Sequence, residues 1–263
     1  MGRSLKELIK PFIPYRVRVA IRSILEREAV DPRDVKAVQA ITSEQWRTLG
    51  KRSAKYLESY WSGADDDTQD TAGKRRSAWL ADLSQFREVR SVMELGCGAG
   101  RNLFVLQQRF PGVALYGLDI NPEGMAHARR HVKGEFTLGN LYDLESVLGD
   151  RSVDLIFTMG VLIHLHPDTL PGLIRSMRRR ARKYLVFVEQ VSPDNEVVKG
   201  PARWRPTRRM TGDYIQWSPN LPGILEQLGF PYQLSDLPTA CQSNGARHLI
   251  VVDLRDATDG RTG

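Results

Sequence analysis

The sequence predicts an α/β fold with a doubly wound, mostly parallel sheet, and two observations support this. From residue 90 onward, short apolar runs alternate with amphipathic segments, which is typical of parallel strands joined by helices on both faces of a sheet. The first apolar run leads directly into a glycine-rich loop, GCGAG, at residues 96–100. Such sheets bind ligands at the carboxyl ends of their strands, so this loop marks the predicted binding edge.

Each element follows from its own local pattern. Apolar runs of strand length occur at residues 90–95 and 152–160. A helix is favoured at residues 122–131, because proline suits the first turn of a helix and Pro122 stands there. The helix expected at residues 221–228 ends before Gly229, a residue favoured after a helix end. The expected strands are residues 90–95, 113–120, 134–140, 152–160, 183–190 and 247–254, and the expected helices between them are residues 101–109, 122–131, 167–180 and 221–228.

The chain ahead of the sheet is expected to be helical in two parts. Residues 1–34 are predicted to form basic amphipathic helices, interrupted at Pro11 and Pro14. Residues 35–90 are predicted to form a helical cap region, and helices in this position often cover a ligand cleft. The sheet is then assigned to residues 91–254, with an insertion at residues 191–219 and a flexible tail at residues 255–263.

Composition limits the classes of protein to consider. The chain has 263 residues, of which 41% are hydrophobic and 26% charged, as in soluble globular proteins. Its two cysteines, Cys97 and Cys241, argue against a disulfide framework, and no apolar run approaches the roughly 18 residues of a membrane span. We therefore expect a cytoplasmic protein. The net charge of +7 fits solubility alone, and it also fits attraction to an acidic partner such as anionic lipid, a phosphorylated substrate or nucleic acid.

The basic segment of residues 1–25 leaves two interpretations open. A basic amphipathic helix fits an anionic membrane surface, which would give peripheral contact with the inner face of the membrane. The same pattern fits a helix that packs on the main domain.

Two acidic residues stand beside the glycine loop. Glu94 precedes the first glycine by two positions, and the spacing E-x-G-x-G-x-G departs from the dinucleotide pattern G-x-G-x-x-G. Asp119 ends the second expected strand, where a carboxylate can accept hydrogen bonds from both hydroxyls of a ribose. A lone Asp there could instead cap a helix, but its pairing with the loop favours an adenosine ligand.

The stretch VMELGCGAGRN, followed by YGLDINPEGMAHAR, resembles the first two motifs of class I S-adenosylmethionine-dependent methyltransferases. The resemblance covers residues 91–254 and implies a Rossmann-like sheet of seven strands with S-adenosyl-L-methionine as cofactor. It implies that the loop passes beside the methionine part, that Asp119 binds the ribose, and that Ile120 lies beside adenine. The full implied cofactor set is Glu94, Gly96, Cys97, Gly98, Asp119, Ile120, Asn140, Leu141 and Met159.

A narrower resemblance comes from FTMGVLIHLHPDTL at residues 157–170. Together with the glycine loop, it is similar to methylases associated with pseudaminic acid biosynthesis and to related sugar and glycan methyltransferases. This implies methyl transfer to a hydroxyl or amine of a sugar-containing small molecule or a glycan intermediate.

Three residues are candidates for catalysis. His164 and His166 follow the fourth expected strand, and histidine suits proton removal at neutral pH, so we assign His164 as general base and His166 as second choice. Either could instead cap the helix at residue 167 or pack in the core. Glu189 ends the fifth strand and could bind an acceptor hydroxyl or amine. No metal site is expected, because two histidines at this spacing are a weak ligand signal.

The insertion mixes basic and aromatic residues that could bind an anionic acceptor. These are Lys199, Arg203, Trp204, Arg205, Arg208, Arg209, Tyr214 and Trp217. Nucleic acid is not the expected partner, although an RNA or natural-product methyltransferase stays an alternative. Two other classes also stay open: an NAD-dependent oxidoreductase, and a non-catalytic protein that binds membrane or nucleic acid.

Overall fold

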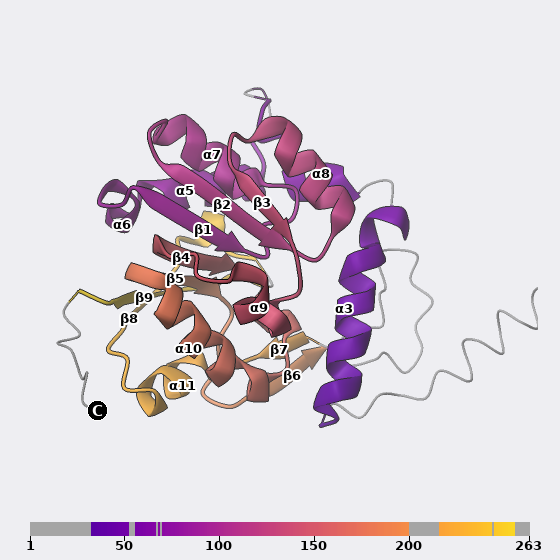
Figure 1. Ribbon diagram of the computed structural model, residues 1–263, viewed down its shortest axis with the longest axis vertical. Helices are drawn as coiled ribbons and strands as arrows, with labels where there is room; N and C mark the ends of the chain where they lie inside the picture. The colour runs from indigo at the N-terminus through magenta and orange to yellow at the C-terminus, as the bar shows by residue number, and fades with distance from the viewer. Residues whose placement is uncertain are drawn as a thin grey trace, which may run out of the picture.

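The computed structural model describes residues 33–52, 56–66, 68, 70–199, 216–243 and 245–255. A seven-stranded sheet lies at its centre, with helices on both faces, and its strand order is β3-β2-β1-β4-β5-β9-β8 (Figure 1). This architecture confirms the predicted fold class.

The strands of this sheet are β1 (Ser91–Leu95), β2 (Ala114–Asp119), β3 (Glu135–Leu138), β4 (Val153–Met159), β5 (Ala181–Glu189), β8 (Gln233–Asp236) and β9 (His248–Asp253). The first five run parallel to one another, as the alternation of strands and helices predicted. β9 pairs antiparallel with β5, and β8 pairs antiparallel with β9. The strand order changes direction between β1 and β4, and the carboxyl ends of these strands therefore flank the position where a ligand is expected.

Apolar side chains cover both faces of the sheet. Val92 and Met93 are neighbours in β1, and they belong to different core clusters because successive side chains of a strand point to opposite faces. One face packs against α9 (Leu144–Leu148), α10 (Leu170–Arg180) and α11 (Leu221–Gln227). The other packs against α5 (Ala72–Asp82), α6 (Ser84–Arg87), α7 (Arg101–Arg109) and α8 (Pro122–His131).

Within the described residues, two further helices precede α5, namely α3 (Val35–Arg52) and α4 (Tyr56–Trp61). In Figure 1, α3 stands beside the sheet, next to α8 and to the ends of β6 and β7. Among the contacts that fix it there, Asn121 Nδ2 donates to the backbone oxygen of Trp46 at 2.7 Å, and Val38 packs on Trp217. The basic helices predicted before residue 33 lie outside the described residues.

The insertion after β5 contains a small antiparallel ladder. β6 (Glu196–Lys199) pairs with β7 (Gln216–Ser218), and residues 200–215 between them are not described. Of the basic and aromatic residues expected there to contact an acceptor, Trp217 alone has a described side chain. It is buried against Val38, with its ring centroid 5.0 Å from that of His166. The structure therefore places Trp217 in a packed core, contrary to its predicted role of stacking on an acceptor.

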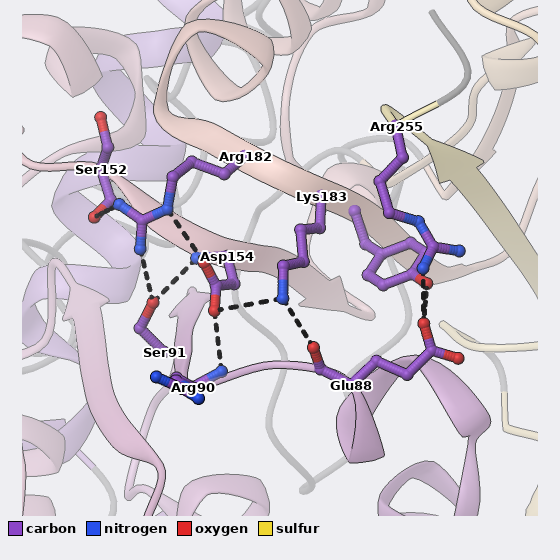
Figure 2. Close-up of polar contacts among 9 residues, drawn as sticks. Glu88, Arg90, Ser91, Ser152, Asp154, Arg182, Lys183 and Arg255 are labelled. Carbon is purple, nitrogen blue, oxygen red and sulfur yellow. Dashed lines mark hydrogen bonds and ion pairs between the residues drawn. The ribbon is translucent and has the colours of Figure 1, made fainter.

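A polar network joins the amino ends of β1, β4 and β5 (Figure 2). Asp154 accepts hydrogen bonds from the Arg90 backbone N–H at 2.8 Å and from Arg182 Nε at 2.9 Å. Ser91 Oγ accepts the N–H of Asp154 at 2.8 Å and also accepts from Arg182 at 3.1 Å. This network stabilises the edge of the sheet opposite the predicted ligand site.

Candidate active site

A cavity of about 330 Å³ opens at the carboxyl ends of β1, β2 and β4. This volume lies within the range of about 300–1,000 Å³ typical of small-molecule sites. All nine residues predicted to contact the cofactor line it, as do residues of α3, α4 and α5. The structure thus brings the predicted cofactor set together, while the contacts themselves remain a prediction.

The glycine loop connects β1 to α7, and at Gly96 its backbone leaves no room for a side chain. Gly96 has a φ of +76°, which favours glycine, and a Cβ there would lie 2.5 Å from a methyl group of Val161. The backbone N–H of Gly96 donates to the oxygen of Leu118 at 2.7 Å, which fixes the loop against β2. The bare loop leaves room for a ligand to lie directly on its backbone.

Asp119 is locked in place at the end of β2. One carboxylate oxygen accepts the N–H of Gly98 at 2.7 Å, and the other accepts the N–H of Asn121 at 2.8 Å. Burial raises the pKa of Asp119, and the backbone N–H groups oppose that shift. The carboxylate is therefore held in one orientation at the cavity wall, as recognition of a ribose diol requires.

Glu94 carries an oxygen that has no hydrogen-bond partner within the described residues. The side chain is 2% exposed, Oε1 accepts from Asn102 Nδ2 at 2.6 Å, and Oε2 is the unpaired atom. Burial raises the pKa of Glu94 to about 8. Because buried polar atoms are normally hydrogen-bonded, this oxygen fits a ligand donor such as the amino group of S-adenosylmethionine.

Helix α3 supplies a wall of the cavity through Thr42, Ser43 and Trp46. Asn140, which belongs to the predicted adenine edge, donates to Ser43 Oγ at 2.9 Å. The sequence predicts that helices ahead of the sheet cover the cleft, but it does not single out Thr42 or Ser43. Their position depends on packing between segments almost a hundred residues apart, for which the local sequence carries no signal.

His164 is the catalytic candidate that reaches the cavity wall. It lies in the 3₁₀ turn η3 (Leu162–His164), and its ring packs on that of Trp46 with centroids 4.6 Å apart. Its imidazole therefore faces the same space as the glycine loop and Asp119.

His166 does not line the cavity. It is 5% exposed, and its Nδ1 accepts the N–H of Asp168 at 3.2 Å, so it caps the 3₁₀ turn η4 (Pro167–Thr169). The structure thus gives His166 the capping position that was the alternative to a catalytic one.

Glu189 also lies behind the cavity wall. Its carboxylate accepts backbone N–H groups from Val161 and Leu162, and burial raises its pKa to about 8. An acceptor group at this carboxylate would have to displace those bonds. Glu189 is therefore placed to hold the turn that carries His164, and not to bind the acceptor directly.

Two arginines complete the wall and were not assigned a role from the sequence. Arg76 comes from α5, and Arg101 is the first residue of α7, directly after the glycine loop. Both bring positive charge to the cavity wall from helices that flank the glycine loop, whereas the sequence predicts basic residues from the insertion.

Comparison with known proteins agrees with this geometry. Residues 92–183 match the family model described as "Methyltransferase domain". Residues 92–183 thus resemble a methyltransferase domain, and the sheet order and the glycine loop agree with the Rossmann-like methyltransferase fold.

Among curated proteins, the chain is similar to trans-aconitate 2-methyltransferase of Methylobacterium nodulans, with 38% identity over 88 residues. The match covers 33% of this chain and 33% of that protein, so the chain spans about a third of its relative's length. The corresponding protein of Delftia acidovorans is 30% identical over 106 residues, which cover 39% of this chain and 40% of that protein.

Solved structures share the fold at low identity. Magnesium protoporphyrin IX methyltransferase of Synechocystis, with bound SAH, has a TM-score of 0.53 at 16% identity, covering 82% of this chain and 99% of that chain. An O-methyltransferase family protein from Burkholderia thailandensis has a TM-score of 0.52 at 16% identity. The match covers 96% of this chain and 88% of that chain. At such identities these structures establish the fold alone. None of these comparisons identifies a sugar acceptor.

Proposed function

We propose that this protein transfers the methyl group of S-adenosylmethionine to a hydroxyl or amine of a small-molecule acceptor that binds beside His164. One observation supports this most directly: His164 lines the same cavity as the glycine loop and Asp119. The proposed base for the acceptor and the proposed cofactor-binding residues thus line the same cavity.

When bound, the cofactor supplies a methyl group on a positively charged sulfur, open to in-line attack. Asp119 would orient the adenosine through its ribose, and Glu94 would accept from the amino group of the methionine part. The imidazole of His164 would take the proton of the acceptor oxygen or nitrogen as that atom accepts the methyl group. Helix α3 forms part of the cavity wall and would help to exclude water, so most of the rate gain would come from positioning.

We propose a sugar-containing, anionic acceptor on the strength of the GVLIH segment and the basic insertion. A second candidate is a carboxylate acceptor, favoured by the similarity to trans-aconitate 2-methyltransferases. The two differ in one chemical respect: a hydroxyl must lose its proton during transfer, whereas an ionised carboxylate has none to lose.

His164→Gln distinguishes these acceptors. The full chain is incubated with S-adenosylmethionine and either a panel of nucleotide sugars or trans-aconitate, and release of S-adenosylhomocysteine is followed. With a hydroxyl or amine acceptor, loss of the base should lower kcat by about 10²–10⁴-fold. Turnover of trans-aconitate at an equal rate by wild type and variant would favour the carboxylate acceptor. Equal turnover of a nucleotide sugar would contradict the assigned base.

We also propose peripheral membrane contact through residues 1–25. In the described part of the chain, no helix is long and apolar enough to cross a bilayer. The basic segment would instead bind an anionic surface. Deleting residues 1–25 should abolish sedimentation with anionic liposomes without changing affinity for S-adenosylhomocysteine. Equal sedimentation of the shortened chain would reject this contact.

A further inference from the structure

Two aromatic rings and an imidazole meet in the cavity wall. The ring centroid of Trp46, on α3, lies 6.0 Å from that of Tyr60, on α4, and 4.6 Å from that of His164. Both contacts are edge-on, with interplanar angles of 86° and 61°. All three side chains line the cavity. Trp46 therefore borders the space next to the proposed base.

The backbone contacts of these rings place them beside the expected position of the cofactor's sulfur. The backbone oxygen of Trp46 accepts from Asn121, two residues after Asp119. That of Tyr60 accepts from Nη1 of Arg101 at 3.2 Å, directly after the glycine loop. In S-adenosylmethionine the sulfur joins the methionine part to the ribose. With the methionine part at the loop and the ribose at Asp119, an acceptor would reach the methyl group past Trp46.

Tyr142 adds a buried hydroxyl to the same wall. The side chain lines the cavity, and its phenol oxygen has no hydrogen-bond partner within the described residues, although buried polar atoms normally have one. Burial raises the pKa of Tyr142 to about 12, and the backbone N–H of His166 opposes that shift. The phenol is therefore protonated at neutral pH and can donate a hydrogen bond.

Two contacts bring Tyr142 to the side of the cavity where Trp46 lies. Asn140, two residues earlier, donates to Oγ of Ser43, which precedes Trp46 by one turn of α3. The backbone N–H of His166, which acts on the phenol, comes two residues after His164. The phenol thus belongs to the part of the wall that also contains the proposed base.

This part of the wall is uncharged, in contrast to the part around the glycine loop. The charged side chains around the loop come from β1, β2, α5 and α7, and they are Glu94, Asp119, Arg76 and Arg101. Among the described residues, α3, η2 (Leu141–Asp143) and η3 contribute no carboxylate, lysine or arginine to the wall. An ionised group of an acceptor would lose its hydration there without gaining a partner of opposite charge.

We propose that Trp46 and Tyr142 form the acceptor subsite and select a reacting hydroxyl that is carried by an uncharged ring. The indole would stack on the flat face of that ring, and the phenol of Tyr142 would donate to a second oxygen of the acceptor. Two kinds of ring offer this chemistry, a pyranose and a phenol. The inference deepens the proposed function and rests on it, since it takes S-adenosylmethionine as cofactor and His164 as base.

Calorimetric titration of the full chain, saturated with S-adenosylhomocysteine, tests the subsite. The pyranose probes are methyl pyranosides of the common sugars, each compared with the alditol of the same sugar, which keeps the hydroxyls but has no ring. Catechol is the phenolic probe, and trans-aconitate is the acyclic anion. Wild type should bind a ring probe more tightly than the alditols and trans-aconitate.

Tyr142→Phe and Trp46→Leu should each weaken binding of that ring probe by about 2- to 10-fold, as expected for one hydrogen bond and one ring contact. Trp46→Phe keeps a ring and should retain most of the affinity. Tyr116→Phe and Trp79→Leu are the matched controls, because both residues lie outside the cavity wall. They should bind the probe as wild type does.

Two further readouts separate this role from a structural one. The hydroxyl of Tyr142 has no partner to lose, so without ligand Tyr142→Phe should be as stable as wild type in urea unfolding. Affinity for S-adenosylhomocysteine should be unchanged in Tyr142→Phe and Trp46→Leu. If that affinity falls with the affinity for the ring probe, these side chains face the cofactor, which contradicts the proposal.

The proposal is overturned if no ring probe binds wild type more tightly than the alditols and trans-aconitate. It is also overturned if Tyr142→Phe and Trp46→Leu bind the ring probe as wild type does. Binding of a pyranoside alone identifies a sugar ring, and binding of catechol alone identifies a phenolic ring. If wild type does not bind S-adenosylhomocysteine, the cofactor assignment of the proposed function fails, and the ring titrations, repeated without it, decide on the subsite alone.

Discussion

Both carboxylate oxygens of Glu189 lie 3.1 Å from the backbone nitrogen of Val161 and accept its N–H. The same carboxylate accepts the N–H of Leu162 at 3.2 Å. The end of β5 therefore holds the turn after β4, which carries His164 and places Val161 against Gly96. Through this contact one buried acid positions both the proposed base and the glycine loop.

Glu189→Ala should therefore act through position and stability. Removing the carboxylate leaves buried N–H groups of Val161 and Leu162 unpaired, which should cost about 1–3 kcal/mol of unfolding free energy per group left unpaired. Turnover should fall because His164 loses its support. Urea unfolding and kcat measure the two effects. A variant with wild-type stability would contradict this role for Glu189.

Gly96→Ala tests the close approach of the loop to the turn after β4. The new methyl group would meet Val161 at 2.5 Å on a backbone with φ +76°, so both strain and overlap are expected. We expect a loss of about 1–3 kcal/mol of unfolding free energy, together with weaker S-adenosylhomocysteine binding. Gly172→Ala is the control, because nothing lies within 4 Å of its added Cβ. If both variants are as stable as wild type, the close contact between Gly96 and Val161 does not constrain the loop.

His166→Ala separates a capping residue from a catalytic one. The variant loses the acceptor for the Asp168 N–H and the ring packing on Trp217, so unfolding free energy should fall by about 0.5–2 kcal/mol. Because His166 is not in the cavity wall, S-adenosylhomocysteine affinity should stay unchanged. Calorimetry and urea unfolding decide between the roles. Full stability combined with lost turnover would restore His166 as a candidate base.

Asp154 provides a test of pH-dependent stability at the opposite edge of the sheet. Burial would raise its pKa, but hydrogen bonds from Arg90 and Arg182, with the charge of Lys183, lower it overall. Its stabilising contribution is therefore present above the unfolded pKa of about 3.9 and lost as pH falls through the lower folded value.

Asp154→Asn should thus lower unfolding free energy by about 1–3 kcal/mol at pH 7, and the difference should shrink below about pH 4. Urea unfolding at a series of pH values measures it. S-adenosylhomocysteine affinity serves as the control, since Asp154 lies outside the cavity wall. A difference that is constant with pH would mean that the charge of Asp154 is not what stabilises this edge.

Two helices with strong local signals were predicted with the correct boundaries, and most expected strands differ from the observed ones by one or two residues at an end. The helices at residues 101–109 and 122–131 match α7 and α8 residue for residue. In α8, Pro122 is the first helical residue and Asn121 caps it through its side chain. β8 was missed, because QLSD at an exposed edge of the sheet shows neither an apolar run nor alternation.

In the cavity too, residues with a local sequence signal could be predicted, and residues placed by tertiary packing could not. Glu94 and Asp119 could be placed because they flank the strand ends that form the binding edge. Arg76 could not, because nothing in KRRSAW distinguishes it from the exposed Arg75 until α5 packs against α7. Likewise, the sequence predicts that Glu189 ends a strand, but it cannot show that the carboxylate accepts a hydrogen bond from the backbone N–H of Val161.

The central claim is that the cavity binds S-adenosylmethionine, and thermal unfolding with separate ligands tests it most directly. The protein is heated alone and with S-adenosylmethionine, S-adenosylhomocysteine or NADH. A ligand at about a hundred times its dissociation constant adds about 2.7 kcal/mol, a readily measured shift. We predict stabilisation by the first two ligands and none by NADH. Stabilisation by NADH alone, or by none of the three, would contradict the account.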